Sequence, residues 1–259
     1  MRMMKKVLGT VTVLALSVSL LAGCGSTAAS PVSSAASTAA ESTTSSVVSE
    51  TTSAAADENE AAAAQLLNDL TGSYQELWPV ILADEYKQTW LDDCTALVGE
   101  DNAEAAFEKL SSMVTGDVYG EDAVKAYANG GGAYFCGFTN SLATLTFDGE
   151  TSTISGTDKD GNALFSHTYH YIGMEPVHGL YEFESDDADS GEFTYFFLAP
   201  DTSAETYHIE FRYGSDAEAL SQYDAGEYAY WVASGISTDC DQTMIDNCIE
   251  LFCTENLAG

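Results

Sequence analysis

The sequence predicts an α+β fold that is mainly β: an antiparallel barrel preceded by helices and closed by a C-terminal helix. Three observations lead to this prediction. Residues 57–130 are rich in Ala and Leu and show helical spacing, the pattern changes to short alternating segments with turn residues after residue 130, and an amphipathic segment ends the chain. About 200 residues without a break in composition are ample for a single domain.

The N-terminus has the features of a bacterial lipoprotein signal. Three Lys or Arg residues among the first six precede an apolar run and then Leu21-Ala22-Gly23-Cys24. Small residues before a cysteine indicate cleavage and lipid attachment, whereas the alternative is an uncleaved anchor. We expect residues 1–23 to be a signal peptide, Cys24 to be lipidated, and the protein to be extracytoplasmic and held at the cell membrane only through its lipid anchor.

A long polar segment follows the lipidation site. Residues 24–56 are almost all Ser, Thr and Ala, with no aromatic side chain to bury against the entropy cost of ordering. We expect a disordered tether there and one domain over residues 57–259, with a helical part (57–130), a barrel part (131–236) and a C-terminal helix (239–256).

The charge balance is strongly acidic. The chain has 41 Asp and Glu against 8 Lys and Arg, a formal charge of −33, and removal of the signal leaves five basic residues. Such a surface repels nucleic acids and anionic lipid headgroups and concentrates cations. A nucleic-acid partner is therefore excluded.

Five cysteines remain once Cys24 carries a lipid. An odd number cannot pair completely within one chain, no Cys-x-x-Cys occurs, and the spacing resembles no zinc knuckle. We expect disulfides or buried thiols with at least one free cysteine, and the connectivity stays open.

The helical part contains several periodic segments. Residues 58–70 are rich in Ala and Leu, and Tyr74, Leu77, Trp78, Ile81 and Leu82 repeat at helical spacing after Gly72. Shorter helices are expected at 103–113 and 123–128. In the final helix, apolar residues from Met244 to Cys253 share one face and Asp239 is the expected N-cap.

The middle of the chain is expected to supply eight strands. Alternating segments rich in Tyr, Phe and Thr occupy 134–138, 142–147, 151–155, 163–172, 180–184, 192–198, 207–213 and 227–232. Asp148-Gly149 and Asp160-Gly161 are hairpin signals between them. A meander of this kind is expected to close into a small antiparallel barrel.

Four histidines fall in this strand region and are the candidate metal ligands. His208 and Glu210 are two residues apart, so both side chains are expected on one strand face, lining the barrel interior; the alternative is a solvated strand face. His167 and His170 have odd spacing and would need a β-bulge to chelate one ion, with His178 in a nearby turn. These three are the less favoured metal ligands.

Motifs of common enzymes are absent from the sequence. It contains no Gly-x-Ser-x-Gly elbow, no phosphate-binding loop and no His-Glu-x-x-His. We therefore expect a protein that is not an enzyme.

Four segments resemble the ZinT/YodA-like zinc-recruitment domain, which also occurs fused to the C-terminus of AdcA-type zinc lipoproteins. They are Leu70–Pro79 (LTGSYQELWP), Asp187–Tyr195 (DADSGEFTY), Tyr207–Asp216 (YHIEFRYGSD) and Glu227–Trp231 (EYAYW), and the likeness extends from about Leu66 to Ile236. The resemblance implies a lipocalin-like, or calycin-like, barrel with added helices.

The metal ligands depart from the pattern of that family. The family's ligand strand carries His-x-His, and here His208 matches the first position while Glu210 stands in the second. The third ligand falls on Asp201 in one alignment and on Phe196 in the other, and the family's His-rich segment is absent. Asp201, His208 and Glu210 would hold zinc with an open position, or a harder divalent ion, more weakly than three imidazoles would.

The resemblance implies a lipid-anchored protein that captures zinc or another divalent metal ion and presents it to an uptake system, such as the components of a metal ABC transporter. The alternative is a metal-free lipocalin-like module that binds an organic ligand or a protein partner; Phe196 at the third ligand position would favour it.

Overall fold

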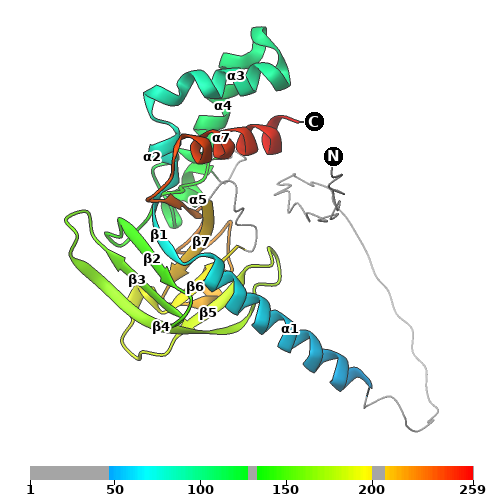
Figure 1. The fold of residues 1–259 in the computed structure, drawn as a ribbon, viewed down its shortest axis with the longest axis vertical. Coiled ribbons are helices and arrows are strands. Elements are labelled where there is room, and N and C mark those ends of the chain that lie inside the picture. The colour runs from blue at the N-terminus through cyan, green and yellow to red at the C-terminus, as the bar shows by residue number, and fades with distance from the viewer. Residues whose placement is uncertain (1–46, 128–132, 200–207, 259) are drawn as a thin grey trace, which may run out of the picture. The chain divides into compact units, whose positions relative to one another are not determined.

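Eight antiparallel strands, each paired with the next along the chain and closed by the first against the last, form a barrel in this computed structural model (Figure 1). The structure describes residues 47–127, 133–199 and 208–258, with side chains from Glu58 onward, and they fall within one compact unit. The strands are β1 (Gly72–Glu76), β2 (Thr144–Asp148), β3 (Thr153–Thr157), β4 (Ala163–Met174), β5 (Tyr181–Ser185), β6 (Tyr195–Leu198), β7 (His208–Gly214) and β8 (Ala233–Ser237).

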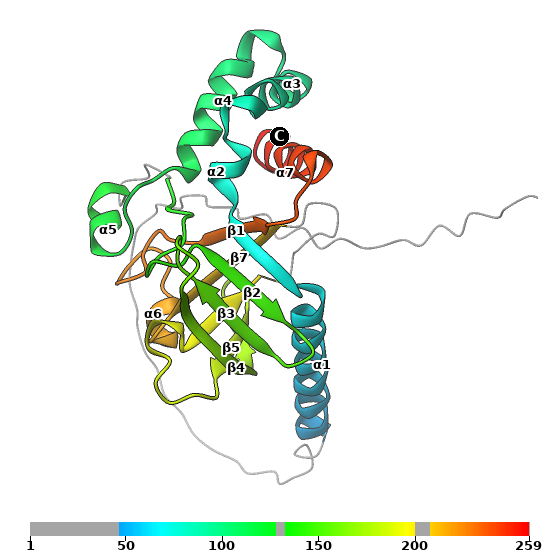
Figure 2. The ribbon, with the colours of Figure 1, turned by 60° about the vertical axis from the view of Figure 1, so that its left-hand side comes forward.

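Helices precede, interrupt and follow the barrel. They are α1 (Val47–Asp69), α2 (Leu77–Ile81), η1 (Asp84–Tyr86), α3 (Lys87–Val98), α4 (Glu100–Val114), α5 (Glu121–Tyr127), η2 (Gly191–Phe193), α6 (Ala217–Leu220) and α7 (Gln242–Leu257). Helices α2, α3, α4 and α7 gather at one end of the barrel, whereas α1 lies along its side (Figure 2). The predicted fold class, a lipocalin-like α+β fold with preceding helices and a C-terminal helix, is confirmed.

Aromatic side chains fill the barrel interior. On β7, Ile209, Phe211 and Tyr213 point inward, and Phe196 of β6 stacks on Tyr213 at 5.4 Å between ring centroids. The Tyr213 hydroxyl donates to the carbonyl of Thr139 at 2.9 Å, which satisfies the polar end of this ring. The interior is thus occupied by close-packed side chains.

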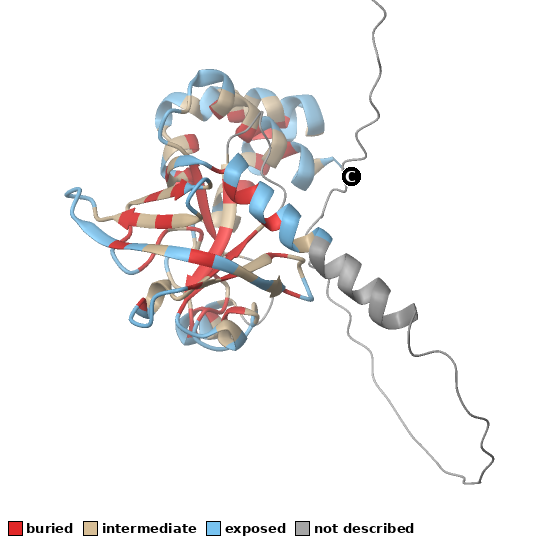
Figure 3. Ribbon diagram, turned by 60° about the horizontal axis from the view of Figure 1, so that its bottom comes forward, coloured by how far each residue is buried: buried red, intermediate tan, exposed pale blue. Residues whose placement is uncertain are grey.

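A second core lies between the helices and the outer face of the barrel. Trp90, Cys94 and Cys253 are fully buried there, together with Ile236 from the outer face of β8. The Nε1–H of Trp90 donates to the carbonyl of Ile81 at 2.7 Å. In Figure 3 the buried residues follow the strands and the inner sides of these helices.

The first strand corrects the predicted division between helical part and barrel. The segment expected to be helical from Tyr74 onward forms β1, which pairs with β2 and β8, and only Leu77–Ile81 is helical. Tyr74 is buried inside the barrel, and the Ser73 and Thr146 hydroxyls are 2.8 Å apart across the strands. Pairing with strands distant in sequence therefore overrides the local helical spacing.

Two predicted strands are wrong. Residues 134–138 contribute isolated bridges from Phe135, and 227–232 are largely turn, with Tyr230 at φ 56°. The closing strand is instead Ala233–Ser237, whose small residues carry little β-propensity. A Cβ at Gly235 would lie 3.1 Å from Ile209, so close packing against β7 explains why this position is a glycine.

Helix boundaries also differ from the predictions. Helix α1 begins at Val47, so the end of the predicted tether (24–56) is helical; its Ala, Ser and Glu residues are compatible with a helix. Helix α3 was not predicted. In α7 the N-cap is Asp241 rather than Asp239, because its carboxylate accepts from the Met244 N–H at 3.0 Å.

Within the described part of the chain, no helix combines the length and apolar character needed to cross a bilayer. The predicted signal peptide and Cys24 lie outside the described residues. Cys94, Cys136, Cys240, Cys248 and Cys253 are all thiols in the structure.

The aromatic interior yields a stability prediction. Phe196 is fully buried among Phe165, Tyr169, Phe211 and Tyr213, so Phe196→Ala is expected to lower the free energy of unfolding by about 3–5 kcal/mol through lost burial and a cavity. Urea denaturation measures the change. Val177→Ala, at a side chain that is 72% exposed, is the control and should change it by less than about 0.5 kcal/mol. Equal effects of the two substitutions would contradict the packed interior.

Candidate metal centre

β7 presents His208 and Glu210 on one face of the sheet, as their spacing predicts. That face is the outer one, not the predicted barrel interior, because the alternate residues Ile209 and Phe211 belong to the interior core. His208 lies opposite Ile236 of β8, whose side chain is in the core under the helices. Large apolar side chains have taken the inward positions, which leaves the imidazole and the carboxylate facing the helices.

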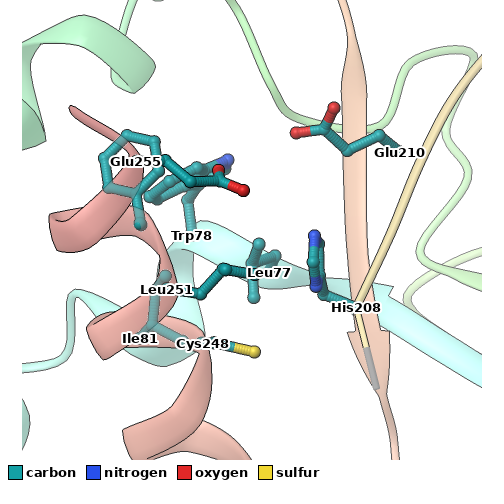
Figure 4. Close-up of a pocket in the computed structure, with 9 residues that line it drawn as sticks. Leu77, Trp78, Ile81, His208, Glu210, Cys248, Leu251 and Glu255 are labelled. Carbon is teal, nitrogen blue, oxygen red and sulfur yellow. The ribbon is translucent and has the colours of Figure 1, made fainter. Parts of the chain in front are cut away.

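A small pocket lies between this face, α2 and α7. His208 and Glu210 line it from β7, and Cys248 and Glu255 line it from α7 (Figure 4). Its remaining walls are Leu77, Trp78, Ile81, Leu251 and Phe252. Its volume is about 30 Å³, room for a water-sized occupant, whereas sites for organic ligands usually measure about 300–1,000 Å³.

The donors in this pocket are of the types that divalent metals bind. An imidazole nitrogen and carboxylate oxygens suit zinc, and thiolates suit it as well. In the described residues, no three His, Cys, Asp or Glu groups are already placed to hold an ion together. His208 and Glu210 are half-buried and Glu255 is exposed, so an ion would have to be enclosed by rotation of the glutamate side chains.

Two thiols near the site are protonated at neutral pH. Burial raises the pKa of Cys248 to about 12, with a further contribution from Cys240. Burial is also the main cause of a raised pKa at Cys136, and the negative charge of Glu210 adds to it. The carboxylate of Glu210 is therefore within electrostatic reach of the buried Cys136, and neither thiol is a ready metal ligand.

Trp78 adds a weakly satisfied donor to the pocket wall. Its side chain is buried, and its Nε1–H makes no well-formed hydrogen bond in the described part of the structure, although the sulfur of Cys136, a weak acceptor, interacts with it. A weakly satisfied buried donor is costly, and occupancy of the pocket by a polar species would satisfy it. The sequence does not predict Trp78 or Glu255 as site residues. The signal that could have indicated Glu255 is its spacing of seven residues from Cys248, which places both side chains on one face of the helix.

The other predicted histidines lie elsewhere on the barrel. His167 and His170 are on opposite faces of β4, since the register shift falls between Tyr171 and Gly173, beyond both rings. His167 Nδ1 is 2.7 Å from Asp187 Oδ2, and His170 Nδ1 is 2.8 Å from Asp186 Oδ1. No bulge brings the two imidazoles together, so one shared ion is not supported.

His178 has a structural environment of its own. The buried carboxylate of Glu175 accepts from the backbone N–H groups of Val177 and His178, at 3.0 and 2.5 Å. The imidazole packs against the ring of Tyr223 at a tilt of 38°, with ring centroids 3.7 Å apart. These contacts fix the turn before β5.

The two alternatives for the third ligand have different outcomes. Asp201 lies outside the described residues, so that position stays a prediction. Phe196 is described, and its ring points into the barrel core on the side of the sheet away from His208 and Glu210. It contributes to packing and not to the site.

A second hollow lies at the start of α5, lined by Tyr119, Gly120, Glu121, Asp122 and Glu227. It offers three carboxylates but no imidazole and no thiol. An open acidic hollow of this kind is a solvated surface, and it combines no donors from a strand and a helix as the β7–α7 pocket does.

Two buried tryptophans provide a matched test of the weakly satisfied donor. Trp90→Phe leaves the Ile81 carbonyl without its donor, whereas Trp78→Phe removes an N–H whose neighbouring acceptor is the weak one at the Cys136 sulfur. Trp90→Phe is therefore expected to destabilise the fold by about 1–3 kcal/mol more than Trp78→Phe, measured by urea denaturation. A larger cost for Trp78→Phe would show that its N–H is paired.

Comparison with known proteins finds similar solved structures. No family model and no curated protein matches the chain. The fold is similar to the Zn(II)-bound ZinT-like domain of Streptococcus pneumoniae AdcA, with 16% identity, TM-score 0.45, and coverage of 71% of this chain and 89% of that one. It is also similar to Zn(II)-bound AdcA of the same organism, with 16% identity, TM-score 0.41, and coverage of 72% and 35%. This is the domain type that the sequence resembles, and at these values neither structure assigns a ligand set to this chain.

Proposed function

We propose that this protein binds a divalent metal ion of the zinc class in the pocket between β7 and α7, with His208, Glu210 and Glu255 as ligands. One observation carries the proposal: an imidazole and two carboxylates from a strand and a helix line the same pocket, whose volume is about 30 Å³. A pocket of that size suits an ion with a bound water and is about tenfold too small for a typical organic ligand.

The donor types favour zinc over calcium or magnesium. Calcium takes six to eight oxygen ligands and magnesium keeps several waters in octahedral geometry, whereas one nitrogen, two carboxylates and an open position match four-coordinate zinc. The acidic surface, with its formal charge of −33, raises the local concentration of any cation. The proposed site has one imidazole, so its affinity for zinc is lower than that of a site with three histidines. A moderate affinity suits a protein that must release its metal.

The last turn of helix α7 supplies the third ligand of the proposed site. His208 and Glu210 are held by the pairing of β7 with β8, and Glu255 is in the last turn of α7. Trp78 offers its Nε1–H to an acceptor such as a ligand carboxylate or a metal-bound water. Cys248 is protonated, so it lines the pocket without acting as a metal ligand.

An organic ligand inside the barrel is not favoured. The interior positions are occupied by Phe147, Phe183, Phe196, Phe211 and Tyr213, each at most 1% exposed. Lipocalin-like barrels that hold a ligand keep an internal cavity of its size, and here aromatic rings occupy that space.

We further propose that the protein is a lipid-anchored, extracytoplasmic lipoprotein that passes its metal to an uptake system, such as a metal ABC transporter. The signal pattern ending in Cys24 supports the anchor, and the resemblance of Tyr207–Asp216 to the ligand strand of zinc-recruitment domains supports the role in uptake.

Metal binding is tested with residues 25–259, made without a His tag, by elemental analysis and calorimetry with zinc. One ion per chain is expected. His208→Ala, Glu210→Gln and Glu255→Gln are each expected to weaken binding by about tenfold or more, because each removes a ligand. Asp201→Asn tests the remaining sequence prediction by the same measurement.

Two variants serve as controls for that experiment. His170→Ala removes a histidine on the outer face of β4, and Cys248→Ser removes the protonated thiol in the pocket wall. Both should leave the affinity within about twofold of the parent chain. No zinc binding by the parent, or equal losses in His170→Ala and His208→Ala, would refute the site.

The anchor is tested by Cys24→Ala in the full chain produced in a bacterial host. The parent is expected in the membrane fraction with a covalent fatty acid, detectable by radiolabelled palmitate, and the variant is expected to lose the label. A variant that keeps the label would contradict lipidation at Cys24.

A further inference from the structure

We propose that Cys94 of α3 and Cys253 of α7 form a disulfide that ties the C-terminal helix to the helical layer. Their sulfurs are 3.9 Å apart, and both residues are fully buried in the core between the helices and the barrel. Both are thiols in the structure. A disulfide needs about 2.05 Å between sulfurs, so closing the bond requires a movement of about 2 Å.

The two helices are already aligned for this bond. Cys94 is four residues after Trp90, so the two side chains share a face of α3. Phe252, next to Cys253, packs against Trp90 and Trp78, with centroid distances of 5.9 and 4.7 Å. The aromatic contacts hold α7 on α3 and bring the sulfurs together without help from the bond itself.

The reaction is a thiol–disulfide exchange with an external disulfide, either a low-molecular-weight disulfide or an oxidised dithiol oxidoreductase. The Cys253 thiolate attacks one sulfur of the donor, forms a mixed disulfide and releases the first donor thiolate. The Cys94 thiolate then attacks the Cys253 sulfur and releases the second. The two protein thiols lose two protons and two electrons, and the donor is reduced by the same two electrons.

Burial determines when this exchange can occur. Both side chains are 0% exposed, so an external disulfide cannot reach either sulfur while α7 is docked. Burial also raises the pKa of both thiols, which lowers the fraction of reactive thiolate. The bond therefore forms while the chain folds, before α7 closes over α3, and is inaccessible to reductant afterwards.

The bond has a consequence for the proposed metal site, and this step rests on that proposed function. Glu255 is two residues after Cys253, and Cys248 lies on the pocket side of the same helix. A covalent tie at Cys253 fixes the α7 wall of the pocket opposite His208 and Glu210. Cys136, Cys240 and Cys248 stay as thiols, which agrees with an odd number of cysteines.

The test uses residues 25–259, which contain every described helix and strand and lack Cys24. The chain is refolded from denaturant with either oxidised glutathione or a reductant, alkylated, digested without reduction and mapped by mass spectrometry. The oxidised sample is expected to give one cross-linked peptide pair, Cys94 with Cys253, and alkylated Cys136, Cys240 and Cys248. Its melting temperature is expected to exceed that of the reduced sample by about 10 °C, since the bond closes a long loop.

Serine variants, and oxidation of the folded reduced protein, serve as controls for this disulfide experiment. Cys94→Ser and Cys253→Ser should each abolish the cross-link and the difference in melting temperature, and Cys240→Ser should preserve both. Folded reduced protein should acquire the bond at least about tenfold more slowly than refolding protein. Full alkylation of all five cysteines after oxidative refolding, or a cross-link between other cysteines, would overturn the proposal. None of these readouts involves metal, so they stand whether or not zinc binds.

Discussion

The pairing of β1 with β8 is the constraint on which the rest of this structure depends. It closes the barrel through Tyr74 opposite Ser237, Gln75 opposite Ile236 and Glu76 opposite Gly235. β1 runs directly into α2, and β8 leads within a few residues to α7. The ladder that closes the barrel therefore also places both helices that wall the pocket, next to the outer face of β7.

The alternation of β7 then divides packing from chemistry. Inward side chains complete an aromatic core, in which Phe196, Phe211 and Tyr213 are fully buried. The outward side chains His208 and Glu210 face α7, where the side chains of the second core leave a small pocket. Both donors are in register with β8, so moving their backbone would break the ladder between β7 and β8.

Much of this arrangement is visible in the sequence, and the errors have a common cause. The spacing of His208 and Glu210 correctly predicts that they share a face, but which face is inside depends on neighbouring strands. The spacing from Tyr74 to Leu82 predicts a helix, and only the distant partners β2 and β8 show that Tyr74 belongs to a strand. Helical periodicity places Cys248 and Glu255 on one face of α7, yet no local pattern indicates that this face meets β7.

The site also explains why the C-terminal helix must be held well. In the proposed site, His208 and Glu210 come from β7 and Glu255 comes from the last turn of α7, so the position of α7 would set the geometry available to an ion. Side-chain packing of Phe252 on Trp78 and Trp90 restrains that helix. In the proposed site, packing and a covalent tie at Cys253 would hold α7 in place, so rotation of the glutamate side chains, and not movement of the helix, would enclose an ion.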